Sequence, residues 1–249
     1  MGNLLLRKIT EKCWQVGFFG TLKHIAKRLF WSLRPCYIRF LLSERAFDRK
    51  YGTETRGTIT NGNLDVPQDK LEHAVRYEAT SVELGNRILQ ELPISYENYI
   101  FVDFGSGKGR ILLLASNFPF RKIIGVELLP LVNEIACNNI RIYKSESQKC
   151  YNLESVCLDA KDFEIPDEKA VFYFYHPFDE YVMRAVLSNI EASLKRYPRK
   201  IYIVYALPTY RDLMDGSAFL RNIRKEIISK KHWEDLILKY CIYESRNPS

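Results

Sequence analysis

The sequence lacks the marks of a membrane-spanning, secreted or zinc-binding chain. No apolar run approaches the roughly 20 residues that cross a bilayer, and the first apolar stretch, residues 4–6, is too short for the core of a signal peptide. None of the six cysteines forms a C-x-x-C pair, and the four histidines do not have the spacing of zinc ligands. We therefore expect reduced thiols, no bound metal and a cytoplasmic location.

Most of the chain has no net charge. Residues 1–45 hold nine Lys or Arg and two acidic residues, which accounts for the whole net charge of +7 over 249 residues. The other residues carry equal numbers of acids and bases, so we do not expect nucleic acid as a partner. The basic segment favours an anionic surface such as a membrane, where the protein would then be peripheral.

An amphipathic helix is predicted within this basic segment. Apolar residues recur at helical spacing over residues 21–33, and Lys23, Lys27 and Arg28 share the opposite face. Such a helix could bind a membrane, bind an acidic partner or pack across the core as a cap. Its basic, acid-poor composition also fits a transit peptide. These alternatives stay open at the level of the sequence.

Composition also indicates where the main domain begins. Glycine, threonine and asparagine are frequent over residues 51–70, which predicts a loop that serves as a lid or as an ordinary linker. We therefore divide the chain into a basic helical extension (1–50), a loop or lid (51–75) and a main domain (76–249).

Strand and helix patterns alternate through the main domain, which predicts an α/β fold with a doubly wound, mostly parallel seven-stranded sheet. The expected strands are residues 99–104, 122–127, 153–158, 170–175 and 200–206, and the expected helices are residues 80–92, 109–117, 131–143 and 180–197. Thr80 and Glu83 fit a capping box at the first of these helices. Two further strands, near residues 224–229 and 236–244, are expected to form a C-terminal antiparallel pair because they are separated by few residues.

The strongest chemical signal is the segment V-D-F-G-S-G-K-G-R, residues 102–110, between a predicted strand and a predicted helix. Glycines let a backbone turn sharply and approach a ligand, and the helix start offers free N–H groups. The third glycine comes one residue too early for a dinucleotide loop. Asp103 would repel a pyrophosphate, but it suits a ligand that carries an ammonium and a sulfonium, as S-adenosylmethionine does. Lys108 and Arg110 are expected to be solvated or bonded locally.

Further polar residues follow the other predicted strands. Glu127 ends the second strand, where a carboxylate can accept hydrogen bonds from both ribose hydroxyls of a nucleoside. Asp159 and Ala160 follow the third strand, and the segment H-P-F-D, residues 176–179, follows the fourth. Ligands of open α/β sheets bind at the carboxyl ends of the strands, so we expect these residues to surround one site.

In their order along the chain, these motifs resemble those of the Rossmann-like, seven-stranded (class I) S-adenosylmethionine-dependent methyltransferase superfamily, over about residues 75–245. The chain also looks like bacterial members of uncertain substrate and, more distantly, like protein-lysine methyltransferases. The resemblance implies S-adenosylmethionine as the cofactor and a methyltransferase domain over residues 76–249. The residues that it assigns to cofactor binding are Tyr77, Glu78, Thr80, Asp103, Gly105, Ser106, Gly107, Gly109, Glu127, Leu128, Asp159, Ala160 and His176.

Within that resemblance, the glycine loop and Asp103 would hold the methionine part, Glu127 the ribose, and Asp159 with Ala160 the adenine. Residues 77–80 resemble a segment that closes over the methionine end in some of these enzymes. His176 and Asp179 are the candidate catalytic residues: His176 would accept a proton or orient the acceptor, and Asp179 would bind a cationic acceptor such as lysine.

The acceptor itself is not determined by the sequence. A protein side chain, in particular lysine, is one hypothesis, and a small molecule or lipid, with the basic helix at a membrane surface, is a second. A non-enzymatic cofactor-binding module is a third. A dehydrogenase is disfavoured by the glycine spacing.

Overall fold

The computed structural model describes residues 35–57, 79–226 and 240–246. The chain divides into two compact units, Met1–Ala46 and Phe47–Ser249. Helix α2 (Pro35–Tyr51) contributes to both units. The helix predicted over residues 21–33 lies outside the described residues, as do Tyr77 and Glu78. Among the described residues, no helix is both long enough and apolar enough to cross a membrane.

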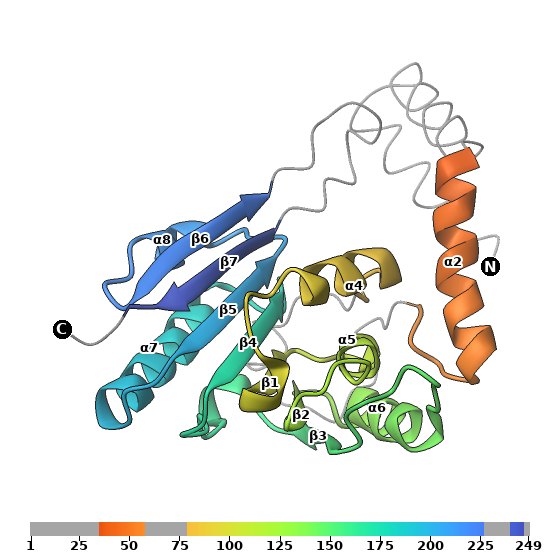
Figure 1. The fold of residues 1–249 in the computed structure, drawn as a ribbon, viewed down its shortest axis with the longest axis horizontal. Helices are drawn as coiled ribbons and strands as arrows, with labels where there is room; N and C mark the ends of the chain where they lie inside the picture. The colour runs from red at the N-terminus through yellow and green to blue at the C-terminus, as the bar shows by residue number, and fades with distance from the viewer. Residues whose placement is uncertain (1–34, 58–78, 227–239, 247–249) are drawn as a thin grey trace, which may run out of the picture. The chain divides into compact units, whose positions relative to one another are not determined.

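The larger unit is built on one seven-stranded sheet with the order β3-β2-β1-β4-β5-β7-β6 (Figure 1). Its first five strands are parallel, and β7 pairs antiparallel with both β5 and β6. The strands are β1 (Ile100–Phe104), β2 (Lys122–Glu127), β3 (Leu153–Cys157), β4 (Ala170–Tyr175), β5 (Ile201–Ala206), β6 (Leu220–Glu226) and β7 (Tyr240–Ser245). The predicted α/β fold, with its antiparallel C-terminal pair, is confirmed.

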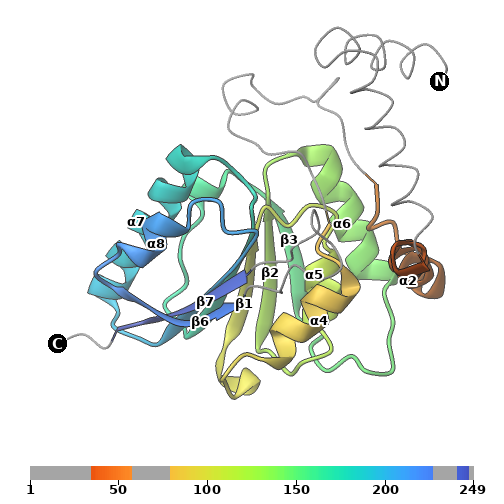
Figure 2. The same ribbon diagram turned by 90° about the horizontal axis from the view of Figure 1, so that it is seen from above.

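Helices cover both faces of the sheet (Figure 2). On one face lie α4 (Val82–Gln90), α5 (Arg110–Ala115) and α6 (Pro130–Ile142), and on the other lie α7 (Glu180–Arg196) and α8 (Arg211–Asp215). Each face has its own apolar core, and the strands between them alternate: Val171 and Tyr173 of β4 join one core, whereas Phe172 and Phe174 join the other. This double burial explains why β4 is apolar along its length.

The predicted cap of helix α4 was wrong. The cap of α4 is Ser81, whose Oγ accepts a hydrogen bond from the Leu84 N–H at 3.2 Å, so the Thr80–Glu83 capping box does not form. The Thr80 hydroxyl instead lies 2.9 Å from the Tyr173 hydroxyl, because a long-range partner competes with the local one.

The C-terminal strands are also displaced from their predicted positions. Strand β6 begins at Leu220 and ends at Glu226, and β7 runs from Tyr240 to Ser245. Among the described strands, β6 pairs with β7 alone, and exposed charged residues such as Arg221 and Arg224 interrupt its apolar pattern. A strand that is covered on one edge only therefore gives a weaker sequence signal than a central strand.

Candidate functional site

The glycine loop connects β1 to α5 and folds over the end of β2. Gly105, Gly107 and Gly109 have φ values of +74°, +56° and +83°, in the left-handed region that glycine adopts with little strain. The N–H groups of Gly105 and Ser106 donate to the Val126 carbonyl at 2.8 and 3.1 Å. The loop is thus held against the neighbouring strand by its own backbone.

Glu127 ends β2 and is bound to this loop. Its Oε2 accepts a hydrogen bond from the Gly107 N–H at 2.8 Å, and its Oε1 accepts one from the Leu129 N–H at 2.9 Å. Burial raises the pKa of Glu127, and backbone hydrogen bonds from Leu129, Gly107 and Leu128 act in the opposite direction. Each carboxylate oxygen has a second lone pair, so the group can accept further donors from a ligand.

Asp103 is a buried carboxylate near the end of β1, two residues before Gly105 of the glycine loop. Its pKa is raised well above the usual range, first by burial and then by the negative charge of Glu127. Among the residues that the structure describes, no group donates a hydrogen bond to this carboxylate. A buried carboxylate beside another carboxylate is stabilised by a cation, and a cationic ligand would meet that need.

Two buried hydroxyl residues, Thr80 and Ser106, are further candidates for the site around Asp103 and the glycine loop. Thr80 lies beside Tyr173, which pairs with Asp103 in the β1–β4 register. Ser106 is buried, and its hydroxyl has no hydrogen-bond partner in the described part of the chain. Such a hydroxyl remains available as a donor to a ligand.

The end of β3 is joined to the end of β2 by a backbone hydrogen bond. The Leu158 N–H donates to the Glu127 carbonyl at 2.9 Å. Asp159 then caps the short 3-10 helix η2 (Ala160–Asp162), because its Oδ1 accepts a hydrogen bond from the Lys161 N–H at 3.0 Å. Ala160 is buried and Leu128 is half-buried. One oxygen of Asp159 therefore has a structural task in addition to the predicted contact with adenine.

His176 follows β4 in a conformation that is rare for residues other than glycine. Its φ is +42°, and the only other described non-glycine residue with positive φ is Leu207 at +48°, which follows the adjacent strand β5. Burial lowers the pKa of His176, and its Nδ1 is buried without a partner among the described residues. Strained backbone of this kind is typical of functional sites, and a neutral imidazole can accept a proton.

Pro177 places His176 next to the glycine loop. A Cβ atom added at Gly105 would collide with the Pro177 side chain, so the two backbones approach each other closely. The ring of Tyr210 lies 5.8 Å from the His176 ring, and Tyr210 is a candidate site residue that the motifs did not identify. Asp179 caps α7 by accepting a hydrogen bond from the Val182 N–H at 3.1 Å.

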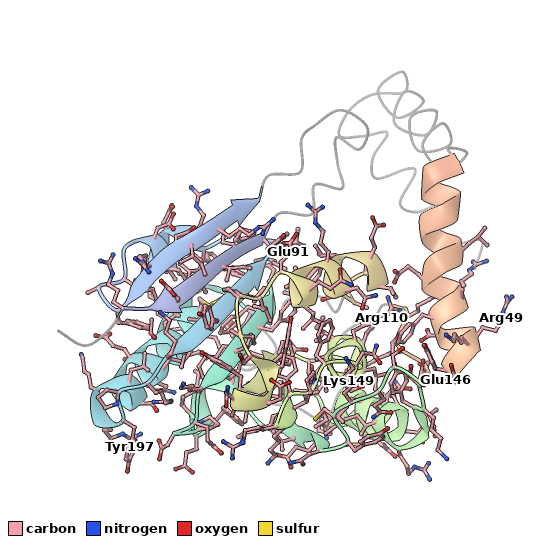
Figure 3. All side chains as sticks on the ribbon, viewed as in Figure 1. Arg49, Glu91, Arg110, Glu146, Lys149 and Tyr197 are labelled. Carbon is pink, nitrogen blue, oxygen red and sulfur yellow. The ribbon has the colours of Figure 1, made fainter. Side chains whose placement is uncertain are left out.

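The expectation for Lys108 and Arg110 was wrong. Both side chains are buried, and they bind residues 54–56 and 80 rather than solvent or near neighbours. Figure 3 labels Arg110 at the start of α5. The sequence separation of these contacts, between 30 and 55 residues, hides them from any local pattern.

No protein-family model matches the chain, and the search of curated proteins found no match either. Its fold is similar to those of several solved structures. A SAM-dependent methyltransferase of Leishmania major is 12% identical over 66% of this chain and 70% of its own, with a TM-score of 0.48. An RNA methyltransferase of Salinibacter ruber, in complex with S-adenosyl-L-homocysteine, is 15% identical over 69% and 95%, with a TM-score of 0.44. A precorrin-6y C5,15-methyltransferase of Geobacter metallireducens is 15% identical over 79% and 100%, with a TM-score of 0.47.

Proposed function

We propose that the protein is an S-adenosylmethionine-dependent methyltransferase. One observation carries the proposal: no described residue donates a hydrogen bond to the buried Asp103 carboxylate, which also feels the negative charge of Glu127, the residue that holds the glycine loop. This arrangement fits a ligand that is cationic at one end and carries vicinal hydroxyls nearby. When bound, S-adenosylmethionine supplies an activated methyl group on a sulfonium.

Each end of the cofactor has a candidate partner in the chain. Asp103 binds the ammonium of the methionine part, because a cation offsets the burial of the carboxylate. Glu127 accepts hydrogen bonds from the ribose hydroxyls with the lone pairs that Gly107 and Leu129 leave free. Asp159 and Ala160, after β3, would hold the adenine, and the glycine loop, which has no Cβ atoms at three positions, would let the methionine part approach the backbone closely.

His176 and Asp179 act on the acceptor side. Methyl transfer to nitrogen needs a neutral lone pair, so a base must take up a proton from a protonated amine. The lowered pKa of His176 keeps its imidazole neutral near neutral pH, and its buried Nδ1 is a candidate acceptor or orienting group. Asp179 attracts a cationic acceptor such as lysine, because its carboxylate keeps its negative charge while it accepts the hydrogen bond that caps α7.

The experiment that tests the cofactor is titration calorimetry with S-adenosylmethionine, S-adenosyl-L-homocysteine and NAD. We expect micromolar binding of the first two and none of NAD. Asp103→Asn is the matched variant, since it keeps the shape of the side chain and removes its charge. Its affinity should fall for both S-adenosylmethionine and S-adenosyl-L-homocysteine, because both carry the ammonium that Asp103 would bind. Binding of NAD alone, or equal binding by wild type and variant, contradicts the proposal.

The acceptor is then identified with isotopically labelled cofactor. Protein, RNA and small-molecule fractions are incubated separately with the enzyme, and the labelled product is found by mass spectrometry. The control is His176→Ala, which should bind the cofactor but transfer little label. If no fraction is labelled by a protein that binds the cofactor, the non-enzymatic alternative is favoured.

A further inference from the structure

Residues 53–56 form a compact turn that is organised by Asp48. The Thr53 Oγ1, the Thr55 N–H and the Thr55 Oγ1 all donate to Asp48 Oδ1, at 2.9, 3.0 and 2.6 Å. The Arg56 N–H donates to Asp48 Oδ2 at 3.1 Å. One carboxylate therefore fixes four donors, and the turn has a defined shape of its own.

This turn contacts the side chain of Lys108 in the glycine loop, residues 105–109. Lys108 lies between Gly107 and Gly109, and its Nζ contacts Glu54 Oε1 at 2.5 Å and the Arg56 carbonyl at 3.1 Å. The Lys108 side chain is only 7% exposed, whereas that of Glu54 is 69% exposed. The loop thus places its own charged side chain in a buried position and receives the neutralising charge from residues more than 50 positions earlier in the chain.

Asn139 of α6 joins the turn and the loop from a third direction. Its Nδ2 donates to the Glu54 carbonyl at 3.1 Å and to the Lys108 carbonyl at 2.9 Å, and its Oδ1 accepts from the Glu54 N–H at 2.8 Å. Asn139 is fully buried. A buried amide that uses both of its polar atoms in this way fixes the separation of the two segments that it bridges.

Arg110, the first residue of α5, adds a second link. Its Nε donates to Thr55 Oγ1 at 2.7 Å, and its Nη1 contacts the Thr80 carbonyl at 3.5 Å. Burial lowers the pKa of Arg110 to about 10, so it remains charged near neutral pH. Lys108 and Arg110 together tie both sides of Gly109 to the turn.

The glycine loop needs such external support. Three of its five residues are glycines with positive φ, and glycine loses more backbone freedom on ordering than any other residue. A loop that moves freely would bind a ligand more weakly, because the ligand must then supply the cost of ordering it. Glu127 holds the loop at Gly107, and the turn holds it one residue later at Lys108.

We propose that Glu54, Lys108 and Asn139 are positioning residues that hold the glycine loop in its ligand-binding conformation. The inference rests on the proposed function for the identity of the ligand. The contact between the turn and the loop then sets the affinity for S-adenosylmethionine through the conformation of the loop.

The test uses Glu54→Gln, Lys108→Met and the double variant, each titrated with S-adenosylmethionine in the calorimeter. If the residues act by position, all three variants bind roughly tenfold more weakly, because each loses the same charge-assisted hydrogen bond. The double variant should be no weaker than the weaker single variant. Glu191→Gln, which breaks the exposed pair with Lys195 on α7, is the matched control and should bind as the wild type does.

A purely electrostatic effect gives a different pattern. The Glu54–Lys108 pair is neutral as a whole, so Glu54→Gln adds positive charge, Lys108→Met adds negative charge, and the double variant restores neutrality. Electrostatics alone would weaken the first variant, tighten the second and return the double variant to wild-type affinity toward a cationic ligand. That pattern, or unchanged affinity in all three variants, overturns the inference.

Hydrogen exchange of the ligand-free proteins separates this inference from the proposed function. The amides of residues 105–110 should exchange faster in each of the three variants than in the wild type, while melting temperatures stay close. A wild-type protein that binds no S-adenosylmethionine contradicts the proposed function, but the exchange rates still report on the contact. Unchanged exchange in residues 105–110 contradicts the positioning role.

Discussion

The side chain of Glu127 accepts a hydrogen bond from the Gly107 N–H at 2.8 Å, and this bond joins the end of β2 to the glycine loop of β1. The two residues are 20 positions apart in the chain, and their strands are neighbours in the sheet. Glu127 therefore has two tasks: it holds the loop in place and, in the proposed function, it presents free lone pairs to a ribose.

These tasks are separated by comparing Glu127→Gln with Glu127→Ala. The glutamine keeps one acceptor for a backbone N–H but presents donors where the second oxygen was, so we expect cofactor affinity to fall by about tenfold to a hundredfold, as for the loss of hydrogen bonds to a charged group. The alanine variant should lose at least as much affinity, and its melting temperature should fall as well because buried N–H groups lose their partners. Calorimetry and thermal denaturation provide the two readings. Wild-type affinity in both variants would remove Glu127 from the site.

Asp103 should destabilise the ligand-free protein at neutral pH. Its folded pKa is raised, chiefly by burial, so its contribution to stability is fully present below the unfolded pKa and is lost as pH rises through the folded pKa. Asp103→Asn should therefore be more stable than the wild type by about 1 kcal/mol near pH 7, as is typical when a destabilising residue of a functional site is replaced. The advantage should shrink as the pH falls. Denaturant unfolding at several pH values measures it, and a variant that is less stable throughout contradicts the account.

The same raised pKa links cofactor binding to protons. A cationic ligand favours the ionised form of Asp103, so binding should release a proton wherever the ligand-free carboxyl still holds one, and affinity should rise with pH through that range. Calorimetry in two buffers of different ionisation enthalpy counts the proton. Asp103→Asn is the control, and it should remove most of the difference between the two buffers.

If His176 acts as a base, kcat should persist to lower pH than it would with an exposed histidine. Burial lowers its pKa below the ordinary value, so the imidazole stays neutral, and competent as a base, at pH values where an exposed histidine is already protonated. Once an acceptor is found, kcat should stay level down to about pH 6.5, the ordinary value for histidine, and fall only below it. His176→Gln should lower kcat without a comparable change in cofactor affinity. Equal losses in both quantities would indicate a binding role.

Glycine substitutions measure how closely the loop approaches the chain after β4. Gly52 and Gly105 have similar φ values, +69° and +74°, but a Cβ at Gly52 meets nothing within 4 Å, whereas a Cβ at Gly105 collides with Pro177. Gly52→Ala should cost about 1–2 kcal/mol of stability from backbone strain alone. Gly105→Ala should cost more and should also impair cofactor binding. Equal losses in the two variants would mean that the contact with Pro177 relaxes easily.

The parts of the fold that the sequence predicted well are those with a strong local pattern. Strands β2 and β4 have their predicted bounds because central strands are apolar on both faces. The glycine loop and Glu127 were identified because the residues stand at the carboxyl ends of predicted strands. What the sequence could not predict depends on distant partners: Thr80 binds Tyr173 rather than capping α4, and the partners of Lys108 lie more than 50 residues away. The predicted roles of Asp159 and Asp179 remain predictions, since the structure assigns each a cap as well.

The position of β6 has a consequence for how the protein behaves in concentrated solution. All six residues of β7 are buried, and β6 covers one edge of that strand. Strand β6 carries the guanidinium groups of Arg221 and Arg224, whose side chains are 65% and 43% exposed and pair with Glu244 and Glu91. Charge on an outermost strand discourages two sheets from joining edge to edge. A chain shortened or unravelled at β6 would expose the edge of β7, whose buried residues include Tyr240, Ile242 and Tyr243, and would be prone to self-association.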